Sequence, residues 1–261
     1  MSPELFDLFS RLSRLPRQVP CDDRTNTDAA IREFYRYVHA RGVAHCNLGG
    51  FQLTEDGKGD ARQFSASLMP LSFQEEFAEE MARDDYVLLK AGELGPTRPA
   101  ARFRIGLPAL QEIAAFNPAS VPVQQECARQ GIVEGVAFIG DTLGAYRSPG
   151  GRFFGFVFAG EKGSGEHIES LGQELELASY ALLDRIAPSL HAHIDGFDEK
   201  LTPRERDVLR WLAEGSQRQD IAHRLSISVP TVDMHAANLR RKLGATTLAE
   251  AVAKGIRYCI I

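Results

Sequence analysis

Residues 216–243 read SQRQDIAHRLSISVPTVDMHAANLRRKL, and the pattern of this stretch decides the fold of the carboxy-terminal part of the chain. Apolar residues recur at helical spacing on both sides of Ser226-Ile227, which interrupts the pattern as a turn does. After the turn, the apolar residues follow one another at intervals of four, three and four: Val232, Ala236, Leu239 and Leu243. This spacing places them on one buried face. The stretch therefore predicts two helices, 217–225 and 228–243, joined by the short turn at Ser226-Ile227.

The opposite face of the second helix is small near its start and basic near its end. A helix thinned by Ala237 can enter the major groove of DNA, where Asn and Arg reach base edges and basic side chains neutralise phosphates. Two short helices joined in this way have the helix-turn-helix layout. The predicted DNA-binding residues are Ser228, Thr231, Asp233, Met234, Ala237, Asn238, Arg240, Arg241 and Lys242. A helical protein-interaction module with a solvated charged face is the alternative.

Capping boxes predict where the neighbouring helices begin. Thr202-Pro-Arg-Glu205 combines an N-cap hydroxyl, a proline at the first helical position and a glutamate at the third. Segments 216–219 and 247–250 have the same pattern of hydroxyl and Gln or Glu. Residues 201–261 are therefore expected to form a domain of four short helices.

The charge of the chain divides near residue 200. The whole chain has a net charge of −5, but residues 201–261 hold ten Lys or Arg against six Asp or Glu, a net of +4. The remaining 200 residues hold 20 basic and 29 acidic side chains, a net of −9. Such a change of sign marks a domain boundary and suits a tail that approaches phosphate. We expect domains at 1–190 and 201–261, joined by the polar linker HAHIDGFDEK at 191–200.

Composition excludes several classes of protein. The chain is 44% apolar and 25% charged, as globular proteins are, and its apolar runs are much shorter than the roughly 18 residues of a membrane span. The amino-terminal MSPELFDLF lacks the basic residues of a secretory signal, so a cytoplasmic protein without a membrane partner is expected. The four cysteines form no C-x-x-C pair, and His191-Ala-His193 has no third ligand beside it. No metal, cofactor or enzymatic activity is predicted.

The first 190 residues combine helical and strand patterns. Helices are expected over the amphipathic amino-terminal stretch, over 27–42 and over 166–187, and strands over 43–53, 136–140 and 152–159. Helix, sheet and helix layers in this order predict an α/β/α sandwich with one antiparallel sheet, a shape that can enclose a small ligand. The fold class of the whole chain is therefore α+β, with a carboxy-terminal four-helix helix-turn-helix domain.

The tail also resembles a known family. LTPRERDVL at 201–209, Trp211, DIA at 220–222, His235 and Lys242-Leu243 are similar to the DNA-binding domain of LuxR-type transcription regulators. The resemblance implies that the fourth helix pairs two copies into a homodimer, and that two third helices read half-sites roughly 34 Å apart on double-stranded DNA.

A looser resemblance covers the front of the chain. ARQGIVEGVAFI at 128–139 is similar to a segment of the autoinducer-binding domain of LuxR-type regulators. Five residues align with pocket residues of that family when one deletion is allowed between Phe77 and Asp85. They are Met69, Phe73, Phe77, Asp85 and Tyr86. The resemblance implies that these residues bind a small molecule.

Three of these positions depart from the family pattern of Tyr, Trp and Tyr. Met69, Phe73 and Phe77 donate no hydrogen bond to a ligand carbonyl, whereas Asp85 can still accept one from an amide. Each lost bond costs on the order of 1 kcal/mol, and two or three together lower affinity roughly 10²-fold. We therefore expect a ligand more apolar or aromatic than a simple acyl-homoserine lactone. There are two alternatives. The ligand is a lactone, or the domain binds no ligand and these Met and Phe residues only pack in the core.

The sequence thus predicts a dimeric, quorum-sensing type of transcription regulator in which a small-molecule sensor domain sets the DNA affinity of the tail. The alternative is a ligand-independent regulator whose front domain serves dimerisation or a protein partner.

Overall fold

The computed structural model describes residues 2–15, 24–53, 59–67, 69, 81, 83–94, 101–140, 152–194, 201–258 and 260–261. The chain forms two compact units. One comprises Met1–Leu15 and Asp28–Asp184, and the other Pro16–Thr27 and Arg185–Ile261. The first unit contains a β-sheet, and the second contains the predicted helix-turn-helix segment.

The sheet of the first unit has five strands in the described part of the chain. They are β1 (His45–Leu53), β2 (Gly59–Ser67), β3 (Ala101–Gly106), β4 (Glu134–Gly140) and β5 (Arg152–Gly160). Their order is β2-β1-β5-β4-β3, and every neighbouring pair is antiparallel. The predicted strands correspond to β1, β4 and β5, whereas β2 and β3 were not foreseen. Polar residues dominate β2, and two arginines interrupt the six residues of β3, so neither has the apolar pattern on which the prediction depended.

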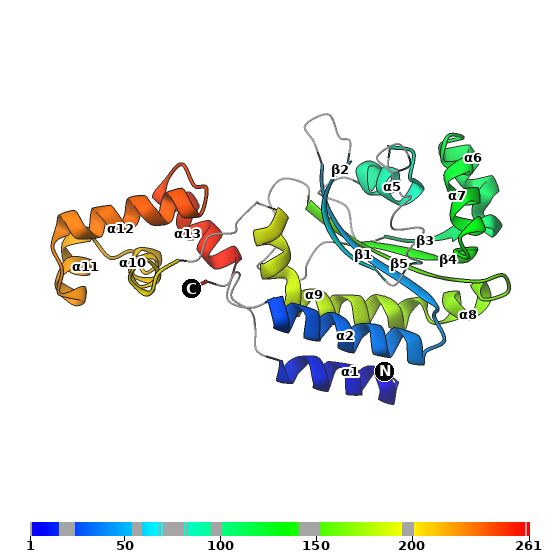
Figure 1. Ribbon diagram of the computed structural model, residues 1–261, viewed down its shortest axis with the longest axis horizontal. Helices are drawn as coiled ribbons and strands as arrows, with labels where there is room; N and C mark the ends of the chain where they lie inside the picture. Colours follow the sequence, from blue (N-terminus) through cyan, green and yellow to red (C-terminus); the bar gives the residue numbers. More distant parts are fainter. Residues whose placement is uncertain are drawn as a thin grey trace. The chain divides into compact units, whose positions relative to one another are not determined.

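Helices cover both faces of the sheet (Figure 1). On one face lie α1 (Pro3–Arg14), α2 (Arg24–Ala40) and α9 (Gly172–Ile194); on the other lie α5 (Tyr86–Leu94), α6 (Leu110–Phe116) and α7 (Ser120–Arg129). The short helix η1 (Leu107–Ala109) links β3 to α6. This arrangement confirms the predicted α/β/α sandwich with an antiparallel sheet.

The central strands are buried on both faces because their side chains alternate between them. Phe154, Phe156 and Phe158 of β5 are fully buried, and the ring of Phe34 on α2 meets the ring of Phe156 edge-on at a centroid distance of 5.6 Å. The residue between two of these phenylalanines, Val157, packs with the apolar cluster on the side of α5, α6 and α7. The phenylalanines of β5 therefore pack toward α2, and Val157 packs toward α5, α6 and α7.

The helix predicted at 166–187 is two helices in the structure. They are α8 (Gly165–Ser170) and α9, which begins at Gly172. A β-carbon at Gly172 would lie 3.1 Å from the Arg102 side chain, so the glycine leaves room for it. Helix α9 runs on to Ile194, so residues 191–194, which the sequence analysis assigned to the linker, are helical. That assignment depended on polar composition, which does not by itself stop a helix.

The second unit has four helices within residues 201–258: α10 (Pro203–Ala213), α11 (Arg218–Leu225), α12 (Val229–Lys242) and α13 (Leu248–Arg257). The predicted capping box of α10 is confirmed: the Thr202 hydroxyl accepts from the Glu205 amide at 3.2 Å, and the Glu205 carboxylate accepts from the Thr202 amide at 2.8 Å. The predicted box at 216–219 is wrong. The N-cap of α11 is Gln217, which makes no side-chain capping bond.

Two close backbone features hold the second unit together. Ser226 ends α11 in the left-handed conformation, with φ at +53°, and this reverses the chain toward α12. Gly255 of α13 lies so close to α10 that a β-carbon there would approach the Leu209 side chain to 2.7 Å. The helices consequently pack around a small core that includes Val208, Val232 and Leu239.

Candidate nucleic-acid interface and sensor core

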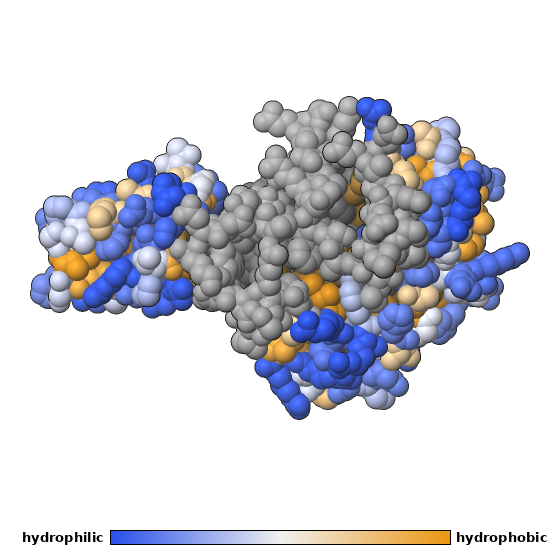
Figure 2. Space-filling model, viewed as in Figure 1, coloured by the Kyte–Doolittle hydropathy of each residue, from blue (hydrophilic) through white to orange (hydrophobic). Residues whose placement is uncertain are grey.

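Helix α12 buries one face and exposes the other. The predicted buried residues are indeed inaccessible, with exposed fractions of 0% to 5% for Val232, Ala236, Leu239 and Leu243. On the opposite face Ala237 and Arg241 are exposed, Asn238 is half-buried, and Met234 is 51% exposed. A base edge in the major groove can cover the exposed half of the Met234 side chain. Figure 2 shows that the surface of the region α10–α13 is mostly hydrophilic in this view, with scattered hydrophobic residues.

The first residues of α12 are held by its N-cap. The Ser228 side chain accepts from the Thr231 amide at 3.3 Å, and the two hydroxyl oxygens lie 2.8 Å apart. Both residues were predicted to bind DNA. Their hydroxyls satisfy each other in this structure, so a contact with phosphate would be made together with the cap rather than in place of it.

Two of the predicted basic residues have partners inside the domain. The Arg240 guanidinium donates to the Thr246 carbonyl at 3.2 Å, which ties the end of α12 to the loop before α13. The Lys242 ammonium lies 2.9 Å from the carboxylate of Glu205, and the Glu205 side chain is only 4% exposed. Burial by itself raises the pKa of Glu205, but hydrogen bonds from Lys242 and Thr202 bring it below its usual value. Lys242 thus joins α12 to the capping box of α10.

Asp233 makes an ion pair that the sequence analysis missed. Its carboxylate lies 2.7 Å from the Arg218 guanidinium on α11, and both side chains are about half exposed. The two residues are fifteen apart in the sequence, so no helical spacing relates them. The contact joins two different helices, so no local pattern in the sequence indicates it.

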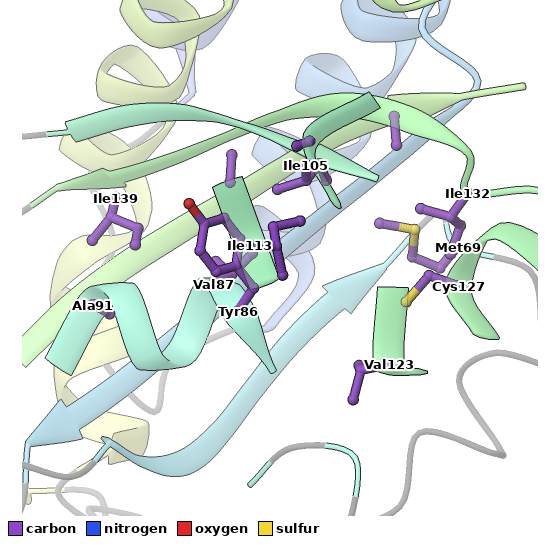
Figure 3. Close-up of a cluster of buried hydrophobic side chains, with 13 residues drawn as sticks. Met69, Tyr86, Val87, Ala91, Ile105, Ile113, Val123, Cys127, Ile132 and Ile139 are labelled. Carbon is purple, nitrogen blue, oxygen red and sulfur yellow. The ribbon is translucent and has the colours of Figure 1, made fainter. Parts of the chain in front are cut away.

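The other candidate site is the apolar cluster between the sheet and helices α5, α6 and α7. Figure 3 shows its buried side chains converging, with Met69 beside Cys127 and Ile132. Met69 and Tyr86, two of the predicted ligand-binding residues, belong to this cluster. Phe73 and Phe77 lie outside the described residues. The sequence analysis did not include several other members of the cluster among the ligand-binding residues, because they come from segments far apart in the sequence: Ala91, Ile105, Ile113, Cys127 and Ile139.

Asp85 is the charged residue at the edge of this cluster. It directly precedes α5, and its carboxylate accepts from the Leu88 amide at 2.9 Å, as an N-cap does. Burial raises the pKa of Asp85 to about 6, although the Leu88 and Val87 amides act in the opposite direction. The charged carboxylate is therefore costly where it lies, and a donor arriving with a ligand would reduce that cost.

Tyr86 and Cys127 are held by their surroundings. The Tyr86 ring packs edge-on against Phe103 and Phe116, and its hydroxyl donates to Glu112 at 3.3 Å. Burial raises the pKa of Cys127 to about 12, with a further contribution from the charge of Asp85, so this thiol is neutral and unreactive. Cys46 is likewise a buried free thiol.

The described part of the chain holds no group of three or more His, Cys, Asp or Glu placed to bind a metal ion. Within the same residues, no helix is long and apolar enough to cross a membrane.

Sequence comparison assigns the tail to a family. Residues 199–254 match the profile of the bacterial regulatory proteins of the luxR family. Over 62 residues the chain is 44% identical to the transcriptional activator protein BjaR1 of Bradyrhizobium diazoefficiens, a match that covers 24% of this chain and 26% of BjaR1. The chain thus spans about a quarter of that relative. The carboxy-terminal domain is a LuxR-type helix-turn-helix domain.

Solved structures share the fold of the whole chain. Escherichia coli SdiA superposes with a TM-score of 0.54 at 16% identity, covering 98% of this chain and 97% of SdiA. SdiA in complex with octanoyl-rac-glycerol gives 0.53 at 15% identity, covering 98% and 95%. CepR2 of Burkholderia cenocepacia, described as an N-acylhomoserine lactone dependent LuxR family factor, gives 0.52 at 15% identity, covering 72% and 95%. At these identities the likeness is one of fold.

Proposed function

We propose that this chain, whose tail is a LuxR-type helix-turn-helix domain, is a homodimeric transcription regulator whose amino-terminal unit binds a small molecule and thereby sets its affinity for DNA. The observation that carries the proposal is the division of α12 into a buried face and an exposed face that presents Met234, Ala237 and Arg241. Because its target is chromosomal DNA, we place the protein in the cytoplasm.

The exposed face of α12 suits direct contact with base edges. A methionine side chain can cover the thymine methyl group, an asparagine pairs with adenine, and an arginine pairs with guanine. Met234, Asn238 and Arg241 offer these groups along one helix, and Ala237 between them lets the backbone approach the groove. The phosphate contacts come from the remaining basic residues of a unit with net charge +4 over residues 201–261.

Helix α13 offers the surface through which two copies would pair. Ile256 is 50% exposed on this helix and is the large apolar side chain that a second copy would cover. The preceding residue, Gly255, packs tightly against α10, which fixes the orientation of the exposed side chain. Pairing through α13 would carry two copies of α12 and so set the spacing of two half-sites.

The apolar cluster beside Asp85 supports a ligand that is mainly apolar and carries one hydrogen-bond donor. The described members of the cluster are aliphatic, aromatic or sulfur-containing, and Asp85 is a buried acceptor at their edge. SdiA, which has the same fold, is solved with octanoyl-rac-glycerol, an acyl chain on a hydroxylated head group. Such a ligand needs fewer hydrogen-bond donors from the protein than a lactone does. This agrees with Met69, which donates no hydrogen bond and stands where the family has a tyrosine.

One observation favours the ligand-independent alternative. The Asp85 carboxylate already accepts from the Leu88 amide and so has a structural role without any ligand. In that case the front unit would serve dimerisation or a protein partner.

Thermal unfolding of the full chain separates the two candidates. A ligand at 100 times its dissociation constant stabilises the folded state by about 2.7 kcal/mol, and it can shift DNA binding only if it prefers one dimer arrangement. We expect octanoylglycerol or an aromatic amide to raise the melting temperature more than octanoyl-homoserine lactone does, and to change the affinity for DNA in the same titration. If these compounds and cell extract all leave the melting temperature unchanged, the sensor role is contradicted.

A further inference from the structure

An acidic side chain stands on the DNA-facing surface of α12. Asp233 is the fifth residue of this helix, next to Met234 and one turn before Ala237. Its carboxylate is paired with Arg218, the first residue of α11, at an Nε–Oδ1 distance of 2.7 Å. The side chains are 51% and 55% exposed, so the pair lies on the surface rather than in the core.

A carboxylate at this position is unfavourable toward DNA unless it meets a hydrogen-bond donor. Phosphates repel it, and the groove removes the water that solvates it. Arg218 offsets both costs because it contributes a positive charge and occupies one carboxylate oxygen. The pair also fixes the direction of the Asp233 side chain before DNA binds, which lowers the entropy lost on binding.

Base edges in the major groove offer two kinds of amino donor, cytosine N4 and adenine N6. Adenine carries the N7 acceptor beside N6, and a carboxylate facing both atoms would meet one donor and one repelling acceptor. Cytosine presents N4 without such an acceptor. We propose that Asp233 reads a cytosine in each half-site, and that Arg218 is the positioning residue that orients its carboxylate.

This inference rests on the proposed DNA-binding function and adds one specified base to it. The other exposed groups of α12 suit thymine, adenine and guanine, so a cytosine preference is traceable to Asp233 alone on the strand that this helix contacts. We expect Asp233 to favour cytosine over the other bases roughly 5- to 20-fold. This is at the lower end of what a bidentate contact provides, because only one carboxylate oxygen is available to the base.

The test is selection of binding sites from random duplex DNA by the full chain and by its Asp233→Ala, Asp233→Asn and Arg218→Ala variants. The wild type is expected to enrich cytosine at one position of each half-site. Asp233→Ala should flatten that position and no other, Asp233→Asn should shift it toward adenine, and Arg218→Ala should weaken the preference. Asp220→Asn is the matched control, because it removes an exposed carboxylate from α11 and should leave every base preference unchanged.

The outcomes separate this inference from the function on which it rests. If the wild type enriches a site but Asp233→Ala changes affinity for all sequences by the same factor, Asp233 reads no base and the inference is wrong. Enrichment of adenine by the wild type contradicts the choice of cytosine. If the wild type enriches no sequence, the DNA-binding function itself fails. Circular dichroism checks that the variants fold, as expected for exposed positions.

Discussion

Asp85 illustrates how one side chain serves structure and, in our proposal, recognition. It caps α5 through the Leu88 amide and is buried at the edge of the apolar cluster. Its raised pKa, about 6, against an ordinary value of 3.8, means that the folded state binds the proton more tightly than the unfolded state. The free energy of unfolding contributed by Asp85 therefore falls as the pH rises from about 4 to about 6, and is constant above that window.

We predict that Asp85→Asn stabilises the chain at pH 8 by roughly 1 to 3 kcal/mol and by clearly less at pH 4.5, because the amide keeps the capping oxygen without the buried charge. Thermal unfolding at the two pH values measures the difference. Asp84→Asn, at the neighbouring and less buried position, is the control. An equal gain at both pH values would show that charge burial is not the cause.

Lys242 shows that the sequence identifies a basic residue but not its partner. Spacing placed it beside the DNA-facing surface, whereas the structure places its ammonium against Glu205, 37 residues away in the sequence. Loss of a hydrogen bond to a buried charge costs more than loss of a solvated phosphate contact. The main role that the geometry favours for Lys242 is therefore to join α12 to α10, and contact with phosphate stays a prediction.

For Lys242→Ala we expect the free energy of unfolding in urea to fall by roughly 2 to 3 kcal/mol, because a nearly buried carboxylate loses its cation. Arg241→Ala, at the adjacent exposed position, should lower affinity for the target site by about 1 to 3 kcal/mol. The reverse result, a stable Lys242→Ala protein with a reduced salt dependence of DNA binding, would restore Lys242 as a phosphate contact.

At the scale of elements, the sequence predicted best where apolar residues follow one period. The buried face of α12 and the capping box of α10 came from local spacing, and both are confirmed. Strands β2 and β3 were missed because their stability comes from pairing with β1 and β4, which local pattern does not show. The partners of Asp233 and Lys242 were missed for the same reason, since both contacts join different helices.

The depth to which α12 can enter the groove depends on Ala237. We predict that Ala237→Leu lowers DNA affinity at least tenfold while the domain stays folded, because the position is exposed and the added side chain meets only DNA. Ala213→Leu, at an exposed position at the end of α10, is the control and should bind DNA as the wild type does. Unchanged binding by Ala237→Leu in a fluorescence anisotropy titration would remove α12 from the groove.

For the whole molecule, the net charge of −5 is a sum of two opposite parts. The tail carries +4 and the first 200 residues carry −9, so a single copy has little general attraction for DNA. In the proposed homodimer, affinity comes mainly from base contacts that two copies make together.

The most direct test of the account is the symmetry of the DNA that the full chain selects at about 150 mM salt. We predict a two-fold symmetric site whose half-sites are about 10 base pairs apart from centre to centre, bound by two copies. Ile256→Asp, on the exposed face of α13, should reduce binding to this symmetric site. Its weak binding to a single half-site should stay as in the wild type. A selected site without symmetry, bound by one copy and insensitive to Ile256→Asp, would contradict the account.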